Sequence, residues 1–101
     1  MVVKVTKENF ENVVLKNEKP VMLDFYATWC GPCQMVSPIV DEIANENPQY
    51  TVCKLDVDEE MEIASRFGVV SIPTVVCIKN GEVTGKVVGY VPKEKLLSIM
   101  E

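Results

Sequence analysis

Two cysteines, Cys30 and Cys33, are separated only by Gly31 and Pro32, and two thiols at this spacing can open and close a disulfide. Pro32 is well suited to the first turn of a helix, where its missing N–H group costs nothing. In such a helix the two cysteines share one face, with Cα atoms roughly 5 Å apart, within the span that a disulfide requires. We therefore predict that the pair can be bridged without distorting the backbone.

The expected helix also predicts different properties for the two thiols. Cys30 would lie at or just before the helix start, where unpaired N–H groups and the helix dipole favour a thiolate. Cys33 lies one turn further along and is expected to be more buried and less acidic. The sequence therefore predicts an exposed attacking thiol and a shielded resolving thiol.

A structural disulfide and a zinc site are the two alternative interpretations of this motif. A bridge across so short a loop stabilises a fold by about 2 kcal/mol, against about 3 kcal/mol for a loop of fifteen residues. The chain has no histidine, and its other cysteines, Cys53 and Cys77, are isolated, whereas a second half of a zinc site needs a close pair. We therefore favour a redox-active pair and predict no metal site.

Length and composition restrict the class of protein. The 101 residues, of which 48% are hydrophobic, predict a single domain over residues 1–101. A formal net charge of −5 argues against nucleic acid or an anionic membrane as the main partner. No signal peptide is recognisable, and the longest mostly apolar stretch, residues 69–78, is too short to cross a membrane. We expect a cytoplasmic protein, a setting in which a single Cys-x-x-Cys motif is more often catalytic than structural.

Apolar runs and turn residues predict the element order β-α-β-α-β-α-β-β-α. The strands are expected over residues 2–5, 21–27, 50–57, 73–78 and 83–88, and the helices after Thr6, from Pro32 to about Asn47, over 59–67 and from Pro92. This order predicts an α/β fold with a mixed central sheet and helices on both faces, parallel where helices cross over and antiparallel at the Asn80-Gly81 hairpin. Ligands bind beyond the carboxyl ends of parallel strands, which is where Cys30 falls.

Two of the predicted helices have further features. Pro38 lies inside the helix that starts at Pro32 and is expected to kink it. In the helix over 59–67 the residues expected to face inward are Met61, Ile63, Ala64 and Phe67, with Gly68 as the C-cap. Acidic residues crowd the start of that helix, and we interpret them as a solvated helix start. A calcium loop is excluded because Met61 occupies its glycine position.

The chain resembles the thioredoxin family over essentially its whole length. The resemblance is carried by the run Asp24-Phe25-Tyr26-Ala27-Thr28-Trp29-Cys30-Gly31-Pro32-Cys33, by Pro38, and by Phe67-Gly68-Val69, Ile72-Pro73-Thr74, Lys79-Asn80-Gly81 and Val88-Gly89. It implies a thioredoxin fold and the reduction of protein disulfides by thiol–disulfide exchange, with no cofactor besides the redox-active disulfide.

The resemblance also implies roles for individual residues. The Cys30 thiolate would attack a substrate disulfide, and Cys33 would resolve the resulting mixed disulfide. Asp24 would take the proton of Cys33 through water, with a pKa raised by burial in an apolar strand. The alternative is that Asp24 is a core acid held only by Lys54 on the next strand. Between the cysteines, Gly31-Pro32 lacks the histidine that related oxidants carry and suits a reductant.

Substrate binding and partners are implied in the same way. Thioredoxins hold the proline that matches Pro73 in cis, which lets the backbone of Ile72 pair with an extended substrate. The docking surface would consist of Trp29, Gly31, Pro32, Ile72, Pro73 and Gly89. The expected partners are a flavin-dependent thioredoxin reductase as electron donor and disulfide-containing proteins as substrates, with the chain acting as a monomer. The rival classes are an oxidase or isomerase on the same fold and a structural subunit of a larger enzyme.

The sequence departs from the usual thioredoxin pattern at a few positions. Gln34 stands where lysine or arginine is frequent, so that one positive charge near the thiols is missing. Tyr26 replaces a frequent tryptophan, a change expected to alter packing but not chemistry. Cys53 and Cys77 lie on predicted strands and are expected to be buried small hydrophobic residues, the alternative being a regulatory thiol.

Overall fold

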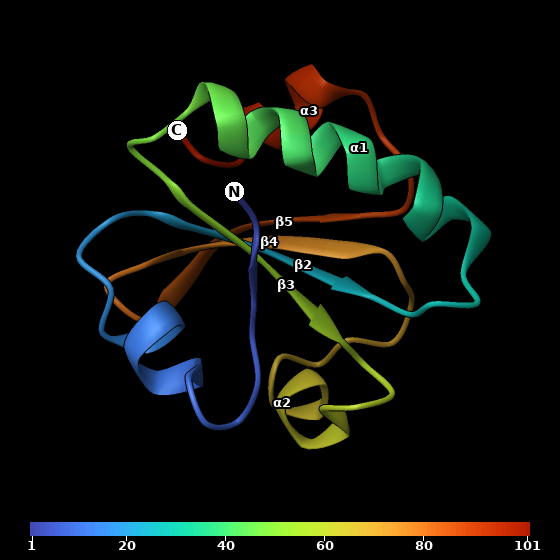
Figure 1. The fold of residues 1–101 in the computed structure, drawn as a ribbon, viewed down its shortest axis with the longest axis horizontal. Helices are drawn as coiled ribbons and strands as arrows, with labels where there is room; N and C mark the ends of the chain where they lie inside the picture. Colours follow the sequence, from blue (N-terminus) through green and yellow to red (C-terminus); the bar gives the residue numbers. More distant parts are fainter.

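The computed structural model describes all 101 residues, and a five-stranded sheet runs through its centre (Figure 1). The strands follow the order β1-β3-β2-β4-β5 across the sheet. They are β1 (Val3–Lys4), β2 (Val21–Tyr26), β3 (Thr51–Asp56), β4 (Thr74–Lys79) and β5 (Glu82–Val88). The apolar run predicted to be a central strand is β2. It lies in the middle of the sheet, and it is buried because helices cover both of its faces.

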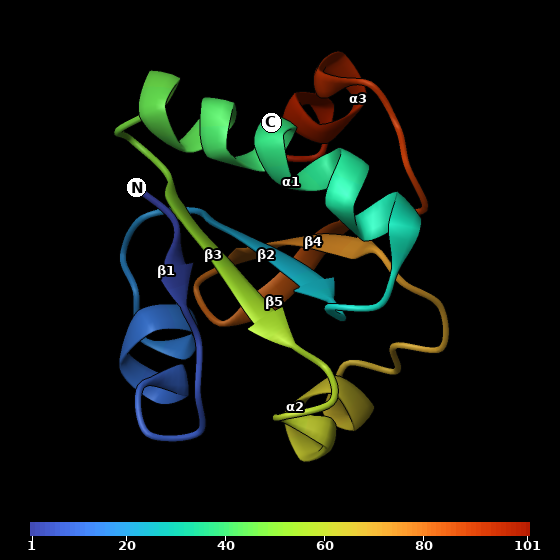
Figure 2. The same cartoon turned by 45° about the vertical axis from the view of Figure 1, so that its right-hand side comes forward.

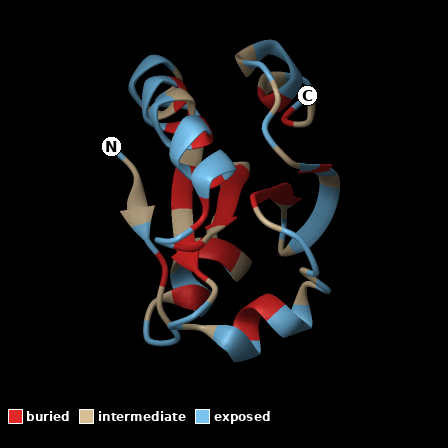
Figure 3. Cartoon of the chain, turned by 90° about the vertical axis from the view of Figure 1, so that its right-hand side faces the viewer, coloured by how far each residue is buried: buried red, intermediate tan, exposed pale blue.

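Helices cover both faces of the sheet, as predicted. On one face lie α1 (Gly31–Glu46) and α3 (Lys93–Ser98), and on the other lie η1 (Glu11–Leu15) and α2 (Met61–Arg66) (Figures 1 and 2). Because side chains alternate along a strand, β2 contributes to two apolar cores. Leu23 and Phe25 pack on the side of η1 and α2, whereas Met22 packs on the side of α1 and α3. Figure 3 shows the buried residues concentrated in the strands and on the inner faces of the helices.

The direction of β4 differs from the prediction. β2 pairs with β3 in parallel but with β4 antiparallel, so that Phe25 faces Thr74 across the sheet. The expectation of parallel strands wherever a helix crosses over is therefore wrong for the connection through α2. After α2 the chain does not return along the sheet: Phe25, near the end of β2, pairs with Leu55 near the end of β3 and with Thr74 at the start of β4. This reversal places Pro73 beside the carboxyl end of β2.

The hairpin between β4 and β5 has the predicted turn. Asn80 and Gly81 both have positive φ angles, 54° and 80°, as a two-residue type I′ turn requires. Gly68 follows α2 with a φ of 67°, the left-handed conformation expected of a residue just past a helix C-terminus. Both of these local predictions from sequence are confirmed.

Two of the shorter helices depart in detail from the expectations. The helix predicted after Thr6 is a short π-helix, and the Asn9 side chain accepts the N–H of Thr6 at 2.8 Å, as the third helical residue of a capping box does. In α2, Ile63 and Ala64 are buried as predicted, but Met61 is 71% exposed and the prediction for it is wrong. At 100° per residue, Met61 lies about 110° from the middle of the arc that the inward-facing residues span.

The longest helix, α1, matches its predicted bounds within one residue and continues through Pro38 without a break. The side chains of Val36, Val40 and Ile43 face the sheet and are buried. No helix in the structure combines the length and the apolar character needed to cross a lipid bilayer.

Candidate dithiol site

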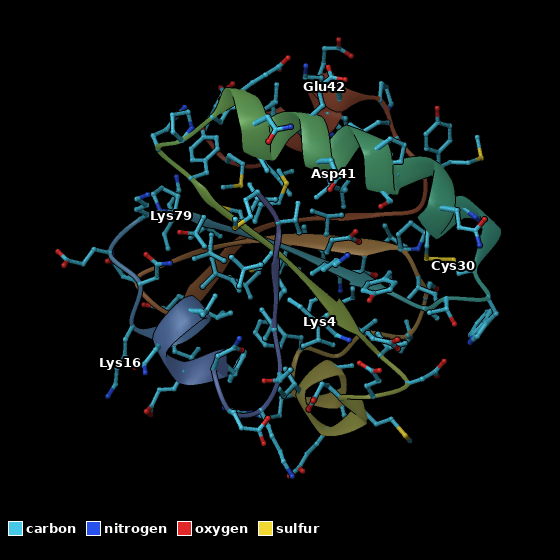
Figure 4. All side chains as sticks on the ribbon, in the orientation of Figure 1. Lys4, Lys16, Cys30, Asp41, Glu42 and Lys79 are labelled. Atoms are coloured by element: carbon cyan, nitrogen blue, oxygen red, sulfur yellow. A yellow bond between two sulfur atoms is a disulfide. The ribbon has the colours of Figure 1, made fainter.

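The two cysteines of the motif lie where β2 gives way to α1, and they are joined by a disulfide (Figure 4). Cys30 is the N-cap of α1 in an extended conformation, and its Sγ atom accepts the N–H of Cys33 at 3.2 Å. The two Cα atoms are 5.3 Å apart, which confirms the distance predicted from helix geometry. The sulfur of Cys30 therefore occupies the position at which a helix N-terminus stabilises a negative charge.

Cys33 is shielded as predicted, but the prediction of an exposed Cys30 is wrong. Cys30 is 5% exposed and Cys33 is 3% exposed. Cys30 is buried because the segment before β4 folds over it, with its Sγ 3.9 Å from the carbonyl oxygen of Ile72, and because Ala27 packs against both cysteines. The asymmetry between the thiols thus lies in their positions along the helix and not in the exposure of the bonded pair.

The residues expected to bind substrate lie around this disulfide. The peptide bond between Ile72 and Pro73 is cis, and the N–H of Gly89 donates to the carbonyl oxygen of Pro73 at 2.8 Å. Gly89 has a φ of 93°, a conformation that favours glycine. Trp29 is 70% exposed, and Gly31 and Pro32 are also exposed. These residues come from three separate parts of the sequence, and the antiparallel β4 and the following β5 bring them to one end of the sheet.

Asp24, in the middle of β2, has a buried carboxyl group. It is 4% exposed, and its Oδ1 atom has no hydrogen-bond partner. Burial raises the pKa of this carboxyl to about 7, while the positive charge of Lys54 lowers it and the negative charge of Asp41 raises it. Asp24 can therefore gain and lose a proton near neutral pH, as the sequence predicted for an acid in an apolar strand.

A cavity of about 230 Å³ connects Asp24 with Cys33. The other side chains that line it are Tyr26, Ala27, Thr28, Gln34, Ser37 and Lys54. A single water needs far less space than this, and the polar groups of the lining provide hydrogen-bond partners. The cavity thus has room for water between the carboxyl and the resolving cysteine.

Lys54 does not neutralise Asp24. The two residues are direct neighbours in the pairing of β2 with β3, yet no ion pair joins them. The Lys54 Nζ atom lies instead 5.8 Å from the centre of the Tyr26 ring, within the range of a cation–π contact. The alternative interpretation of Asp24 as a core acid held by Lys54 therefore lacks the contact that it requires.

Two contacts near the disulfide were not anticipated from the sequence. The indole Nε1 of Trp29 donates to Asp58 at 2.8 Å, and the amide of Gln34 donates to the carbonyl of Thr28 at 3.1 Å. Asp58 belongs to the acidic cluster that the sequence predicts to be a solvated helix start, and nothing in the sequence links positions 29 residues apart. The one available signal was an acidic cluster directly after a strand whose carboxyl end lies beside that of β2.

The two remaining cysteines lie in the cores on opposite faces of the sheet. Cys53 belongs to the core under η1 and α2, and Cys77 to the core under α1 and α3. Both are fully buried, as predicted, and the Sγ of Cys53 lies 3.4 Å from the carbonyl of Met22. Burial raises the pKa of the Cys53 thiol far above its ordinary value.

The fold is a mixed sheet with helices on both faces. Its site combines a cysteine pair at a helix N-terminus with a buried carboxyl whose pKa is about 7 and a cavity between them. These features define a thiol–disulfide oxidoreductase. A family model described as Thioredoxin matches residues 1–101. The chain belongs to the thioredoxin family, and its activity is that of a protein-disulfide reductase.

Individual relatives agree with this assignment. The chain is 50% identical over 96 residues to a Thioredoxin of Mycobacterium tuberculosis, covering 94% of this chain and 83% of the relative. It is 44% identical over 101 residues to a Thioredoxin of Staphylococcus haemolyticus, covering 99% of this chain and 95% of the relative. It is also 49% identical over 96 residues to a protein of Mycobacterium leprae named Bifunctional thioredoxin reductase/thioredoxin, covering 94% of this chain and 21% of that protein.

Proposed function

We propose that Cys30 is the nucleophile of this reductase, that Cys33 is the resolving thiol and that Asp24 accepts the proton of Cys33. The observation that carries the proposal is the buried carboxyl of Asp24, with an unpartnered oxygen and a pKa near neutrality, at one side of a cavity that Cys33 also lines. A buried acid without a partner is costly for the fold, and proton transfer gives it a function.

The reaction consists of two exchanges that transfer two electrons to the substrate. The Cys30 thiolate attacks one sulfur of the substrate disulfide, forming a mixed disulfide and releasing the other substrate sulfur as a thiolate. Cys33 then loses its proton to the carboxylate of Asp24, through water in the cavity. The Cys33 thiolate attacks the sulfur of Cys30, the bond between Cys30 and the substrate breaks, and the reduced substrate leaves as the 30–33 disulfide closes.

The position of each thiol on the helix supports this division of roles. Cys30, as the N-cap, receives the stabilisation that unpaired N–H groups give to a thiolate, whereas Cys33 lies inside the first turn and needs a base. Gly31 and Pro32 add no charge between the thiols, which suits a reductant. Lys54 supports the site through its charge, which lowers the pKa of Asp24.

We propose that the surface around the disulfide, formed by Trp29, Gly31, Pro32, Ile72, Pro73 and Gly89, binds an extended segment of the substrate. Trp29 provides exposed aromatic area, and its hydrogen bond to Asp58 fixes the indole. The cis bond before Pro73 presents the Ile72 backbone beside the sulfur of Cys30. A substrate strand that pairs with this backbone would carry its disulfide to the attacking thiol.

The proposed electron donor is a thioredoxin reductase, and the proposed substrates are disulfide-containing proteins. A relative from Mycobacterium leprae, whose name combines thioredoxin reductase and thioredoxin, supports the pairing of the two activities. We propose that the protein needs no cofactor besides its redox-active disulfide and that it acts as a monomer. We place the protein in the cytoplasm, a compartment in which free thiols such as Cys53 and Cys77 are typical.

The test is the pH dependence of mixed-disulfide resolution in an Asp24→Asn variant. Reduced protein is mixed with a saturating disulfide substrate in a stopped-flow instrument, and closure of the 30–33 bridge is followed by Trp29 fluorescence. In the parent protein the rate should rise as the pH passes through about 7, because the carboxylate form accepts the proton. In Asp24→Asn this rise should be lost, and the rate at pH 8 should fall by about 10²-fold.

The matched control is Asp41→Asn, which removes a nearby acid on α1 whose charge contributes only at a distance to Asp24. Its rate at pH 8 should stay close to that of the parent. An Asp24→Asn variant with the parent's rate and pH profile would remove the proton-acceptor role.

A further inference from the structure

Lys54 has two carboxyl groups as neighbours in the sheet and forms an ion pair with neither. Asp24 lies directly across from it on β2, and Asp56 lies two residues further along β3, so that all three side chains emerge on the same face. Neither carboxyl is within 4.0 Å of the Lys54 ammonium, although a lysine stem is long enough to reach a direct cross-strand neighbour. The ammonium contacts the Tyr26 ring instead.

We propose that Tyr26 is a positioning residue of the dithiol site: its ring holds the Lys54 ammonium away from Asp24 and keeps that carboxyl free to accept the proton of Cys33. The inference rests on the proposed function, since it concerns the group that we assign as the proton acceptor. Tyr26 is half-buried and lines the cavity together with Asp24 and Lys54, so the three groups share one space. Tyr26 would then affect chemistry as well as packing, in contrast to the expectation from sequence.

The charges around Lys54 and Asp24 are consistent with this role. Lys4 is the neighbour of Lys54 on β1, and its ammonium is occupied by Glu59 at 2.9 Å. Asp56 accepts the N–H of Asp58 through its Oδ1. Asp41 from α1 also raises the pKa of Asp24 after the larger effects of burial and Lys54, and Cys33 from α1 lines the same cavity. None of these carboxyls forms an ion pair with the Lys54 ammonium, which lies over the ring of Tyr26.

Burial explains why the ring competes successfully with a carboxylate. An ion pair with Asp24 would take the Lys54 ammonium into the interior and strip it of water, a cost that can exceed the attraction between the charges. Lys54 is only partly buried where it is, and at the ring its ammonium receives the attraction of the π face. Without the ring, nothing would hold the stem away from Asp24, and an opposite charge within about 4–6 Å lowers the pKa of a carboxyl by about 1–3 units.

The experiment follows the titration of Asp24 directly, by carbon-13 NMR of its carboxyl in the oxidised protein, together with the pH profile of mixed-disulfide resolution in the reduced protein. In Tyr26→Leu the midpoint of the Asp24 titration should fall by about one unit or more, and the pH profile should shift with it. Tyr26→Phe keeps the ring face and should behave like the parent. Tyr26→Met is a second apolar replacement, for use if the leucine variant does not fold.

A background that lacks only Lys54 separates movement of its ammonium from simple exposure of Asp24 to water. In Lys54→Met the further change Tyr26→Leu should leave the Asp24 midpoint in place, because no ammonium remains to approach it. The proposal is overturned by an unchanged midpoint in Tyr26→Leu, by the same fall in the Lys54→Met background, or by a fall in Tyr26→Phe. A midpoint that moves while the resolution profile stays fixed would instead overturn the proton-acceptor role of Asp24 and leave the positioning by Tyr26 standing.

Discussion

The chain contains two pairs of cysteines that differ little in exposure and greatly in environment. Cys30 and Cys33 are 5% and 3% exposed, and Cys53 and Cys77 are both fully buried. The first two lie at the start of α1, beside a cavity and a buried carboxyl. The other two lie on β3 and β4, on either side of β2 and in different cores. Low exposure alone therefore does not distinguish a redox-active cysteine from a structural one.

The two pairs of cysteines differ in the backbone groups around each sulfur and in the direction in which the side chains point. The N-terminus of α1 offers unpaired N–H groups to the sulfur of Cys30, whereas the strands that carry Cys53 and Cys77 use their N–H groups in the sheet. Cys30 and Cys33 are three residues apart at the start of a helix and therefore lie on one face of it. Cys53 and Cys77 point to opposite faces of the sheet and cannot form a bridge with each other. Reactivity thus depends on what surrounds a thiol and where its neighbour points.

The largest effect should come from removing one member of each pair. Cys30→Ser should reduce the reduction of a protein disulfide such as insulin to the uncatalysed background, because the attacking thiolate is lost. Cys77→Ser is the matched control in the other pair and should keep most of the activity per folded molecule. Turbidity of reduced insulin measures both. Equal losses in the two variants would contradict the contrast between the pairs.

Alkylation of the reduced protein should separate the pairs next. We expect iodoacetamide to modify Cys30 quickly in the native protein, and Cys53 and Cys77 only when the chain unfolds. For a domain stable by 5 kcal/mol or more, that makes the two core thiols at least about a thousandfold slower. Peptide mass spectrometry over time reports each site. Rapid native labelling of Cys53 would revive its interpretation as a regulatory thiol.

Asp24 affects both pairs of cysteines: it lines the cavity with Cys33, and its charge adds to the burial that raises the pKa of Cys53. Its own pKa is raised from 3.8 to about 7 in the folded protein, so the folded state binds more protons than the unfolded state between these values. Stability should therefore fall as the pH rises from about 4 to about 7. Asp24→Asn should remove this loss and stabilise the oxidised protein at pH 8 by up to about 4 kcal/mol.

Urea unfolding of the oxidised protein at pH 4 and pH 8 measures this effect. The gain should shrink to less than about 1 kcal/mol at pH 4, where the carboxyl is protonated in the folded state and nearly half protonated in the unfolded one. Asp41→Asn is again the control. A gain of the same size at both pH values would mean that packing, and not the buried charge, separates aspartate from asparagine at this position.

The smallest effect should come from trimming a core cysteine. Cys53→Ala and Cys77→Ala each remove one buried sulfur and should cost about 1 kcal/mol of unfolding free energy while leaving the reduction rate unchanged. Urea unfolding and the insulin assay check the two parts. A loss of activity in either variant at full folding would assign the core thiols a part in the reaction.

The sequence determined the features of this protein that depend on short spacing. The bridged geometry of Cys30 and Cys33, the turn at Asn80 and Gly81 and the end of α2 at Gly68 all follow from backbone rules over a few residues, and the structure has each of them. The burial of Asp24 followed equally directly from its place in a continuous apolar run.

Only the tertiary structure decided which distant residues meet. After α2 the chain does not return along the sheet, so β4 runs antiparallel to β2 and the Ile72 carbonyl lies beside the sulfur of Cys30. The same folding buried Cys30, paired Trp29 with Asp58 and set Lys54 on the ring of Tyr26 instead of on Asp24. These contacts depend on strand direction and on competition between neighbouring charges, and neither is encoded in the spacing of the residues that take part.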